Sequence, residues 1–596
     1  MGTNKIKIDK YKNEYSSRIN FFFACLVIIT GAIFIRLFIL QILNYDKYKQ
    51  EALNSQLKQY QIPAERGIIY AEDGNQITPI VLNQKLYTLY ADPTFIKNKS
   101  QATKIAAKIV KVIPSNIQYL VNLMLTKNTQ YVVLANKISQ TQSKTILSYK
   151  IPGIGTIGQD YRVYPYGSLA SQVLGFVNPN GVGEYGIEQF MNQQLAGTPG
   201  RVKAITDASG VPLAATASNV EQNPKNGSNL VLTLNIGMQT QLENILASEY
   251  KLTKSQGLSA IIMNPYNGHI KAMANYPTFN PSNYQNVTNQ KIFQNAAVDD
   301  DIEPGSTMKT LTTSAALNLG VISPSSSFFD PARWTIDGFT ITDIKQDGGA
   351  REQNIQSILA LSLNTGATWM LMQMGGGQIN QKGIDNWYNY MTNHFLLGSD
   401  TGIEQGYEAP GFVPLPNIAD PSIDLRYANT AFGQGVQLTA LQLVSADSAI
   451  LNGGTYYKPT LISKTITPSG KVIINQPVIL KKNIVKPQVG QELTPLMEGV
   501  VKAYLHGGFS FMNFPSNYIV GGKTGTAQVA QPSGGYYKNI FNGTYVGFVG
   551  GNKVQYVIVV YSIKPQVAGY AGSYAAQPVF ADIVHMLIND GYVTPK

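Results

Sequence analysis

Three short groups of polar residues could do chemistry together, and the first is Ser306 with Lys309 in EPGSTMKTLTTSAALNLG. Pro304 and Gly305 interrupt the preceding stretch, and the pattern from Ser306 predicts a helix that ends at Gly320. Residues three apart share one face of a helix, so the Lys309 amine can reach the Ser306 hydroxyl. A serine hydroxyl is a weak nucleophile until a base takes its proton. A lysine can be that base once burial or a nearby cation lowers its pKa.

The second group is Ser362-Leu363-Asn364 in the stretch ILALSLNTG, after an apolar helical run and before a glycine. By itself this stretch favours a structural interpretation, the C-terminal turn of a helix capped by Asn and Gly. The same caution applies to Ser-x-x-Lys, which also occurs at Ser55–Lys58 and Ser248–Lys251. There an exposed helix face is the simpler interpretation. No single group therefore assigns a function.

The third group is Lys523-Thr524-Gly525-Thr526, which follows the apolar strand start YIVGG. The glycines of this segment let another backbone or a ligand approach closely. An edge strand with a lysine and two hydroxyls suits a substrate carboxylate, and the N–H after the glycine can point at a developing oxyanion. A solvated edge strand with a protective lysine is the alternative interpretation.

In this order, the three groups resemble the Ser-x-x-Lys, Ser-x-Asn and Lys-Thr-Gly motifs of penicillin-binding proteins and serine β-lactamases. Leu363 at the middle position favours the penicillin-binding proteins, because many class A β-lactamases have Asp there. The resemblance covers roughly residues 60 to 590. It rests further on IPAERGIIYAEDGNQI, RVYPYGSLASQVLGFV, GVGEYGIEQFMNQQLAGTPG, MNPYNGHIKAMANYPTFNP, AFGQGVQLTALQL and NGGTYYKP. Asn235 and Asn264 replace a usual Asp, and Glu72 departs from the membrane-proximal signature.

The chain thus resembles class B penicillin-binding proteins, and most closely the septal cell-division type. The resemblance implies a serine-type D-Ala-D-Ala transpeptidase that crosslinks peptidoglycan stem peptides, releases D-Ala and is acylated by β-lactams. It implies neither a metal nor an organic cofactor. The implied site residues are Ser306, Lys309, Ser362, Asn364 and Lys523 for catalysis, Thr524, Gly525 and Thr526 for substrate binding, and the N–H groups of Ser306 and Thr526 for the oxyanion hole.

Each implied residue has an expected role. Ser306 attacks the penultimate carbonyl with neutral Lys309 as general base, and Lys523 disfavours protonation of Lys309 by like-charge repulsion. Ser362 relays the proton to the leaving D-Ala, and Asn364 orients Lys309 and the substrate amide. Thr524 and Thr526 bind the terminal carboxylate.

Composition excludes other classes. The single cysteine, Cys25, allows neither an intramolecular disulfide nor a thiolate zinc site, and the four histidines lie far from metal-motif spacing. The formal net charge is +11, but Lys and Arg are scattered and form no basic run interleaved with aromatics. We therefore expect no nucleic-acid binding.

The segment Ile19–Leu43 is mostly apolar, and its single charge, Arg36, lies near one end. At ~1.5 Å per residue it is long enough to cross a bilayer core of ~30 Å. The preceding tail is more basic than the following flank, which places the N-terminus in the cytoplasm and the rest outside the inner membrane of a bacterium. A cleaved signal peptide is the competing interpretation, but the flank after the apolar run has no Ala-x-Ala.

The pattern of elements predicts an α+β fold. Hairpins at 258–275 and 544–563, with helices between them, predict one antiparallel sheet built from strands remote in sequence. The pattern at 578–589 predicts a closing helix. Val220–Ser228 is polar and reads as a boundary loop. The expected parts are a tail (1–18), a membrane helix (19–43), an elongated pedestal of the dimerisation type (44–225) and a transpeptidase domain (226–596).

Several alternatives remain open at this stage. The protein could serve cell-wall elongation, and not division. It could be a hydrolase, a carboxypeptidase or anchored β-lactamase, with Glu404 or Glu408 as a candidate base for water. It could also be a β-lactam sensor or an inactive scaffold. By family analogy, the expected partners are a polytopic membrane glycosyltransferase and division-complex proteins.

Overall fold

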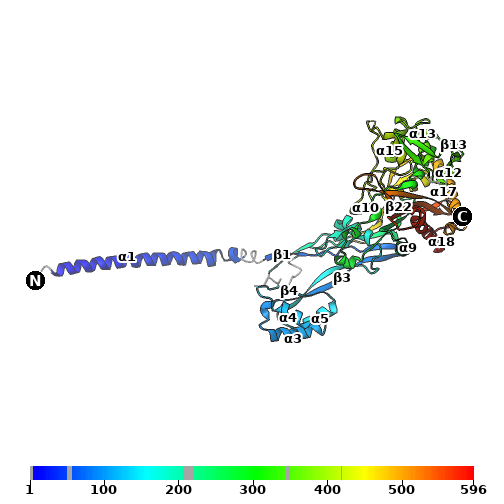
Figure 1. Cartoon of the computed structure of the whole chain (residues 1–596). Helices are drawn as coiled ribbons and strands as arrows, with labels where there is room; N and C mark the ends of the chain where they lie inside the picture. The colour runs from blue at the N-terminus through cyan, green and yellow to red at the C-terminus, as the bar shows by residue number, and fades with distance from the viewer. Residues whose placement is uncertain (1–3, 50–56, 75, 206–219, 344–348, 418) are drawn as a thin grey trace. The chain divides into compact units, whose positions relative to one another are not determined.

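The computed structural model describes residues 4–49, 57–74, 76–205, 220–343, 349–417 and 419–596 (Figure 1). The chain forms two compact units. One comprises Met1–Ala64 with Thr198–Asn226, and the other comprises Glu65–Gly197 with Gly227–Lys596.

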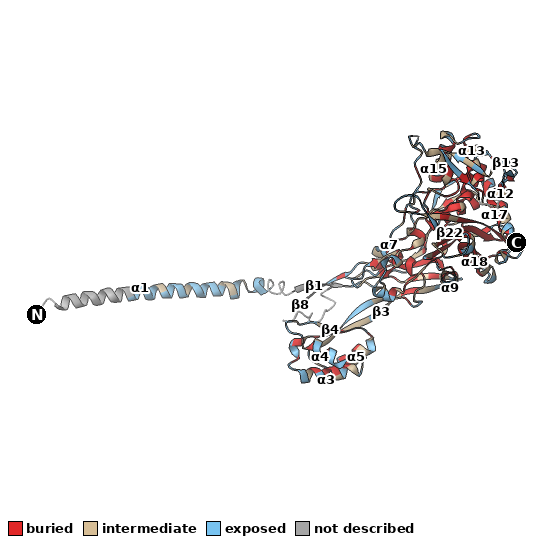
Figure 2. Cartoon of the chain, viewed as in Figure 1, coloured by how far each residue is buried: buried red, intermediate tan, exposed pale blue. Residues whose placement is uncertain are grey.

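The smaller unit contains the apolar N-terminal helix. Helix α1 (Asn4–Phe38) continues into a π-helical turn (Ile39–Leu43). Within the described residues, Ile19–Leu43 is the one helical segment long and apolar enough to cross a membrane, and its side chains are not buried (Figure 2). This unit also holds an antiparallel sheet of order β1 (Leu57–Ile62), β8 (Gly200–Ile205) and β9 (Val220–Gln222). The boundary loop expected at Val220–Ser228 is therefore wrong for its first three residues, which pair as a strand.

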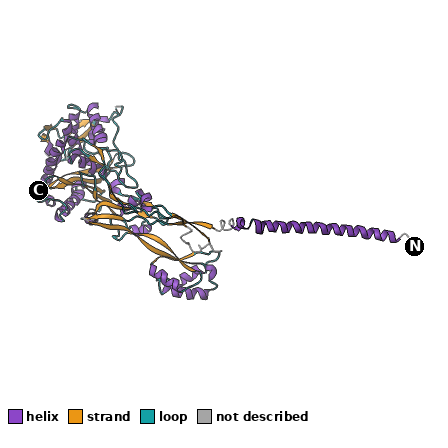
Figure 3. Ribbon diagram, turned by 180° about the vertical axis from the view of Figure 1, so that it is seen from behind, coloured by secondary structure: helices purple, strands orange, loops and turns teal. Residues whose placement is uncertain are grey.

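A seven-stranded sheet in the larger unit joins segments that are remote in sequence. Its strands are among those drawn in orange in Figure 3. Its order is β19 (Val472–Ile474), β18 (Ile462–Ile466), β10 (Asn229–Asn235), β2 (Ile69–Asp73), β3 (Gln76–Ala91) and β4 (Val132–Ile138), and β5 (Ile154–Val163) also pairs with β3. Helices α3 (Lys99–Val110), α4 (Ile117–Met124) and α5 (Gln140–Ser148) contribute apolar side chains to a separate small core with β3 and β4.

A buried ion cluster joins three signature segments of this region. Glu188 is fully buried and accepts hydrogen bonds from Arg66 Nε at 2.8 Å and Arg162 Nε at 2.7 Å. Arg162 also donates to Asn83 Oδ1 at 2.7 Å. Buried charges persist only when they are paired and hydrogen-bonded, so this cluster fixes the relative position of the three segments.

The second sheet is antiparallel and five-stranded, of order β12 (Ile270–Tyr276), β11 (Gly257–Met263), β23 (Val554–Ile563), β22 (Tyr536–Gly550) and β21 (Ile519–Ala530). Alternate residues face opposite cores. Ala260 and Ile262 pack with α9 (Ile236–Thr253) and α18 (Gln577–Asn589), whereas Ile261 belongs to the larger core on the other face. That core contains α11 (Met308–Leu319) and α16 (Ala440–Leu451).

The larger unit has further α-helices and strands outside these two sheets. They are α6 (Ser171–Leu174), β6 (Phe176–Val177), β7 (Gly183–Glu184), α7 (Gly186–Phe190), α8 (Asn192–Ala196), α10 (Ala296–Asp299), β13 (Ser327–Asp330), β14 (Arg333–Ile336), β15 (Phe339–Thr342), β16 (Arg351–Asn354), α12 (Ile355–Ala360), α13 (Asn364–Met374), α14 (Gln381–Asn389), α15 (Ile423–Thr430), β17 (Tyr456–Tyr457), β20 (Ile479–Lys481) and α17 (Pro487–His506).

The predicted α+β class is confirmed, as are both hairpins and the closing helix. The two Asp-to-Asn departures also have a local explanation. Asn235 Oδ1 accepts from the N–H of Met238 and caps α9, and Asn264 Oδ1 accepts from the N–H of Tyr266 in the β11–β12 turn. An asparagine side chain accepts a capping bond as well as an aspartate does, so these positions tolerate the loss of charge.

Candidate active site

Ser306 lies in a short 3₁₀ turn, Gly305–Thr307, that leads directly into α11. The sequence predicted a helix from Ser306, and the structure differs only in this tighter first turn. Gly305 has φ +56°, and a Cβ there would lie 2.9–3.0 Å from the backbone of Thr526 on β21. The N–H of Gly305 donates to the carbonyl of Gly433 at 3.0 Å. A glycine at this position thus lets the serine turn rest against the edge strand.

Lys309 stands one helical turn after Ser306 and is fully buried. Its Nζ donates to Ser306 Oγ at 3.0 Å and to Asn364 Oδ1 at 2.9 Å. It also lies 2.5 Å from the carbonyl oxygen of Ser362 and 3.3 Å from Ser362 Oγ. These hydrogen-bonding groups are uncharged, and the short distance from Nζ to Oγ suits exchange of a proton with Ser306.

Ser362 lies in the connection from α12 to α13, and Asn364 is the first residue of α13. The interpretation of this stretch as a capped helix end is wrong, because α12 ends at Ala360 and Asn364 begins α13. Ser362 has φ +61°, a conformation uncommon for a residue with a Cβ. Leu363 between them is fully buried, and this anchors the turn while both polar side chains point at Lys309.

Lys523 projects from β21, the edge strand of the five-stranded sheet, as the sequence predicted. It is fully buried, and its Nζ donates to Ser362 Oγ at 2.9 Å and to the carbonyl of Thr524 at 3.0 Å. Burial, and then the charge of Lys309, lowers the pKa of Lys523 well below its ordinary value. The Ser362 hydroxyl therefore lies between two amines, Lys309 and Lys523, and the state in which both amines are protonated is disfavoured.

The rest of the third motif packs closely around this group. A Cβ on Gly525 would lie 2.1 Å from Thr544 Oγ1 and 2.4 Å from the Pro304 carbonyl, so a glycine is needed where β21 passes the serine turn. Thr526 Oγ1 accepts from the N–H of Gly572 at 2.9 Å. Thr524 Oγ1 lies 2.5 Å from the hydroxyl of Tyr504 on α17.

Two residues at this site were missed by the sequence analysis. Asp343 Oδ1 accepts from the N–H groups of Asn364 at 2.5 Å and Thr365 at 3.1 Å, and so fixes the start of α13. Tyr504 contacts Thr524 as described. Neither residue has a spacing that links it to a motif, so the sequence carried no local signal for them.

A buried acid lies behind the serine helix. Thr310 Oγ1, next to Lys309 on α11, donates to Asp447 Oδ1 on α16 at 2.9 Å. Asp447 is fully buried, and burial raises its pKa to about 7. The two carboxylates considered as hydrolytic bases are held elsewhere: Glu404 pairs with Lys458 at 3.2 Å, and Glu408 accepts from the N–H groups of Thr401 and Gly402.

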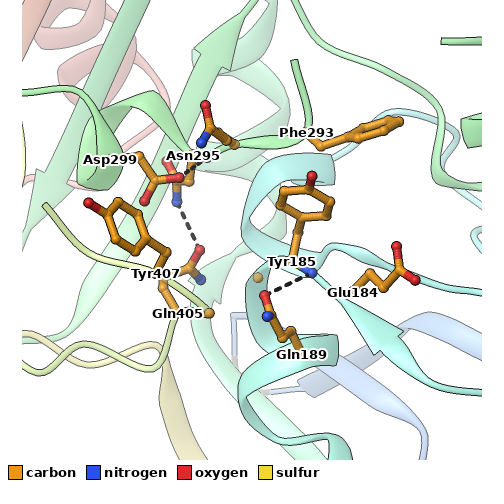
Figure 4. A pocket seen from close by; sticks show the side chains of 11 residues that line it. Glu184, Tyr185, Gln189, Phe293, Asn295, Asp299, Gln405 and Tyr407 are labelled. Carbon is orange, nitrogen blue, oxygen red and sulfur yellow. Dashed lines mark hydrogen bonds between the residues drawn. The ribbon is translucent and has the colours of Figure 1, made fainter. Parts of the chain in front are cut away.

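A separate cavity of about 360 Å³ has a lining that includes none of the motif residues. Figure 4 shows Tyr185 and Gln189 on one side of it and Asp299, Gln405 and Tyr407 on the other. Burial raises the pKa of Asp299 to about 7. Within the part of the chain that the structure describes, no group of three or more His, Cys, Asp or Glu could hold a metal ion.

Comparison with protein families gives two matches. The penicillin-binding protein transpeptidase domain matches residues 258–585, and the penicillin-binding protein dimerisation domain matches residues 61–232. The chain therefore carries a transpeptidase domain and belongs to the class B penicillin-binding proteins.

Individual relatives are similar over most of their length. Stage V sporulation protein D of Bacillus subtilis is 29% identical over 567 residues, which cover 94% of this chain and 84% of the relative. The peptidoglycan D,D-transpeptidase FtsI of Escherichia coli is 24% identical over 600 residues, which cover 99% and 95%. Penicillin-binding protein PbpB of Mycobacterium tuberculosis is 30% identical over 470 residues, which cover 78% and 67%.

Among solved structures, penicillin-binding protein 2X from Streptococcus thermophilus is similar with a TM-score of 0.73 at 24% identity, over 90% of this chain and 80% of that chain. Penicillin-binding protein 3 of Mycobacterium tuberculosis, in complex with aztreonam, has a TM-score of 0.67 at 24% identity, over 90% and 98%. These likenesses confirm the predicted fold.

Proposed function

We propose that this protein is a peptidoglycan D,D-transpeptidase that crosslinks stem peptides through an acyl-enzyme on Ser306. The observation that carries the proposal is the hydrogen-bonded group formed by Ser306, Lys309, Ser362 and Lys523. Relatives named peptidoglycan D,D-transpeptidase support the substrate class, a stem peptide that ends in D-Ala-D-Ala.

In the first half-reaction, Ser306 Oγ attacks the carbonyl carbon of the penultimate D-Ala and passes its proton to neutral Lys309. The N–H groups of Ser306 and Thr526 hold the oxyanion, and one such donor contributes about 10² to 10³ in rate. The peptide C–N bond then breaks. The leaving D-Ala receives the proton from Lys309 through the Ser362 hydroxyl, which already contacts both lysines.

In the second half-reaction, an amine of a neighbouring strand attacks the ester carbonyl. The amine loses a proton to the lysine pair, Ser306 regains one, and a new amide bond replaces the ester. A β-lactam enters the first half-reaction in place of the dipeptide, and the ester that it leaves on Ser306 is slow to hydrolyse. This accounts for acylation by penicillins.

The other motif residues have supporting roles in this scheme. Asn364 holds Lys309 through Oδ1, and its Nδ2 donates one proton to the Thr342 carbonyl at 3.1 Å and has a second one for the substrate. Gly525 keeps the edge strand close to the serine turn. Thr524 and Thr526 bind the terminal carboxylate of the donor peptide.

For the cell, we propose a role in septal wall synthesis during division. The sequences of the first and third motifs, EPGSTMK and KTGTAQ, favour this role over a role in elongation. Ile19–Leu43 would anchor the chain in the cytoplasmic membrane with residues 1–18 inside and the catalytic part outside, and residues 44–225 would form the pedestal of a transpeptidase domain at 226–596. The proposed partners are a polytopic glycosyltransferase and other division proteins.

Two experiments test this function. Fluorescent penicillin should label the wild type and fail to label Ser306→Ala, and a labelled Ser306→Ala would refute the nucleophile. A D-Ala-D-Ala peptide should give a crosslinked product when an amine acceptor is added. Hydrolysis alone, with and without the acceptor, would assign a carboxypeptidase.

The cellular role is tested by location. A fluorescent fusion should gather at midcell in dividing cells. Enrichment along the side wall would assign elongation and would leave the enzymatic proposal intact.

A further inference from the structure

Tyr504 is a polar side chain that the mechanism above does not use. It lies near the C-terminal end of α17, and its hydroxyl is 2.5 Å from Thr524 Oγ1 on β21. Its ring packs edge-on against Phe509 with centroids 5.7 Å apart. Burial raises the pKa of Tyr504 to about 12, so the phenol stays neutral and keeps its proton.

This contact extends a chain of hydrogen bonds that begins in the catalytic group. Lys523 Nζ lies 2.9 Å from Ser362 Oγ and 3.4 Å from Thr524 Oγ1, and Thr524 Oγ1 in turn meets Tyr504. Thr524 thus stands between an amine and a phenol. Thr524 is buried, with 6% of the residue exposed.

The hydrogen-bonding capacity of these groups fixes the direction of each bond. A threonine hydroxyl has one proton and two lone pairs, whereas a substrate carboxylate only accepts. If Thr524 binds that carboxylate, it must donate its one proton to it. Both lone pairs of Thr524 are then open to donors, and Lys523 Nζ and the Tyr504 phenol are the two donors in place.

We propose that Tyr504 is a positioning residue that determines specificity for a free terminal carboxylate. Its O–H donates to Thr524 Oγ1 and leaves the threonine proton directed at the donor peptide. This inference rests on the proposed transpeptidase function, in which Thr524 contacts the carboxylate. Tyr504 itself acts through Thr524.

The experiment compares two inhibitors that differ at the carboxylate, benzylpenicillin and its methyl ester, as competitors of fluorescent penicillin on the full-length protein. The wild type should be acylated faster by the free acid than by the ester. Tyr504→Phe keeps the ring and loses the donor, so it should lower the acid-to-ester ratio about tenfold, the scale of a hydrogen bond that serves a charged group. The rate with the ester should change little.

Tyr545→Phe is a matched control. Tyr545 pairs with Thr524 across β21 and β22, and among the described residues its buried hydroxyl has no hydrogen-bond partner. Removing that hydroxyl should leave the acid-to-ester ratio at the wild-type value. A second test is a double-mutant cycle with Thr524→Val, in which Tyr504→Phe should have no further effect on the ratio.

Three outcomes overturn the inference. Equal loss of rate with acid and ester in Tyr504→Phe would show a structural role only. A lowered ratio in Tyr545→Phe, or a full effect of Tyr504→Phe in the Thr524→Val background, would show that the phenol does not act through Thr524. Failure of the wild type to be acylated by either compound would instead refute the proposed function.

Discussion

Replacing Gly305 with alanine should separate the serine turn from β21, the strand that we propose completes the oxyanion hole. The added Cβ would lie 2.9–3.0 Å from the N, C and O atoms of Thr526, where ordinary contacts begin at 3.4 Å. The turn must therefore retreat by about half an ångström, and an oxyanion donor works over 2.7–3.1 Å. We expect acylation to fall about 10²-fold, the cost of one lost donor.

Gly320 at the other end of the same helix provides a matched control. Its φ is +71°, close to the +56° of Gly305, but a Cβ there would meet nothing within 4 Å. A left-handed conformation costs an alanine about 1–2 kcal/mol in either place. Both variants should lose this stability, and only Gly305→Ala should lose the additional activity.

The assay pairs thermal unfolding with the second-order rate of labelling by fluorescent penicillin, both on full-length protein. Gly320→Ala should unfold at a lower temperature and label at the wild-type rate. Wild-type labelling of Gly305→Ala would show that contact between the turn and β21 does not set the oxyanion geometry, and would refute the reasoning.

Three further outcomes are expected. Lowering the pH through the depressed pKa of Lys523 puts a second proton on the Lys309–Lys523 pair and should slow acylation. Lys523→Met, which cannot take up a proton, should lack this acid limb of the pH–rate profile; wild-type pH dependence in the variant would contradict the assignment. Asp447 has a raised pKa of about 7, so the fold should lose stability as the pH rises from its unfolded value of 3.8 to about 7. Asp447→Asn should abolish this loss, on the order of 4 kcal/mol, when the free energy of unfolding is measured at pH 4 and pH 8. If the free energy of unfolding of Asp447→Asn changed with pH as in the wild type, Asp447 would not be the group responsible. Glu188→Ala leaves buried arginines unpaired and should lower the free energy of unfolding, measured with a chemical denaturant, by about 3–5 kcal/mol. Lys291→Ala breaks an exposed pair with Asp300 and should lower it by about 1 kcal/mol or less. Equal losses in the two variants would contradict this prediction.

The elements that carry the motifs were largely predictable, because local patterns determine them. The Pro-Gly break and the apolar spacing placed Ser306 at the start of a helix, and the glycines around Lys523 placed it on an edge strand. Both hairpins of the five-stranded sheet followed from apolar runs on either side of short polar turns. Such signals lie within a dozen residues and survive in a single sequence.

The connection at Ser362 was not predictable in the same way. An apolar helical run before Asn and Gly reads as a capped end, yet Asn364 begins the next helix and is held there by Asp343. The left-handed conformation of Ser362 is imposed from outside the segment, by the burial of Leu363 and by the bond from Lys309 to its carbonyl. Contacts between remote residues leave no local pattern, and this is also why Tyr504 was missed.

The contacts among Lys309, Ser362 and Lys523 also explain why this energetically unfavourable arrangement of side chains persists. Two buried amines that both contact the Ser362 hydroxyl, and a serine at positive φ, each destabilise the fold. A more stable core would replace the lysines with apolar side chains and the turn with a regular cap. Strain and perturbed protonation concentrate where proton transfer requires them, so the burial of Lys309 and Lys523 beside partly exposed Ser306 and Ser362 is itself an argument for chemistry at this site.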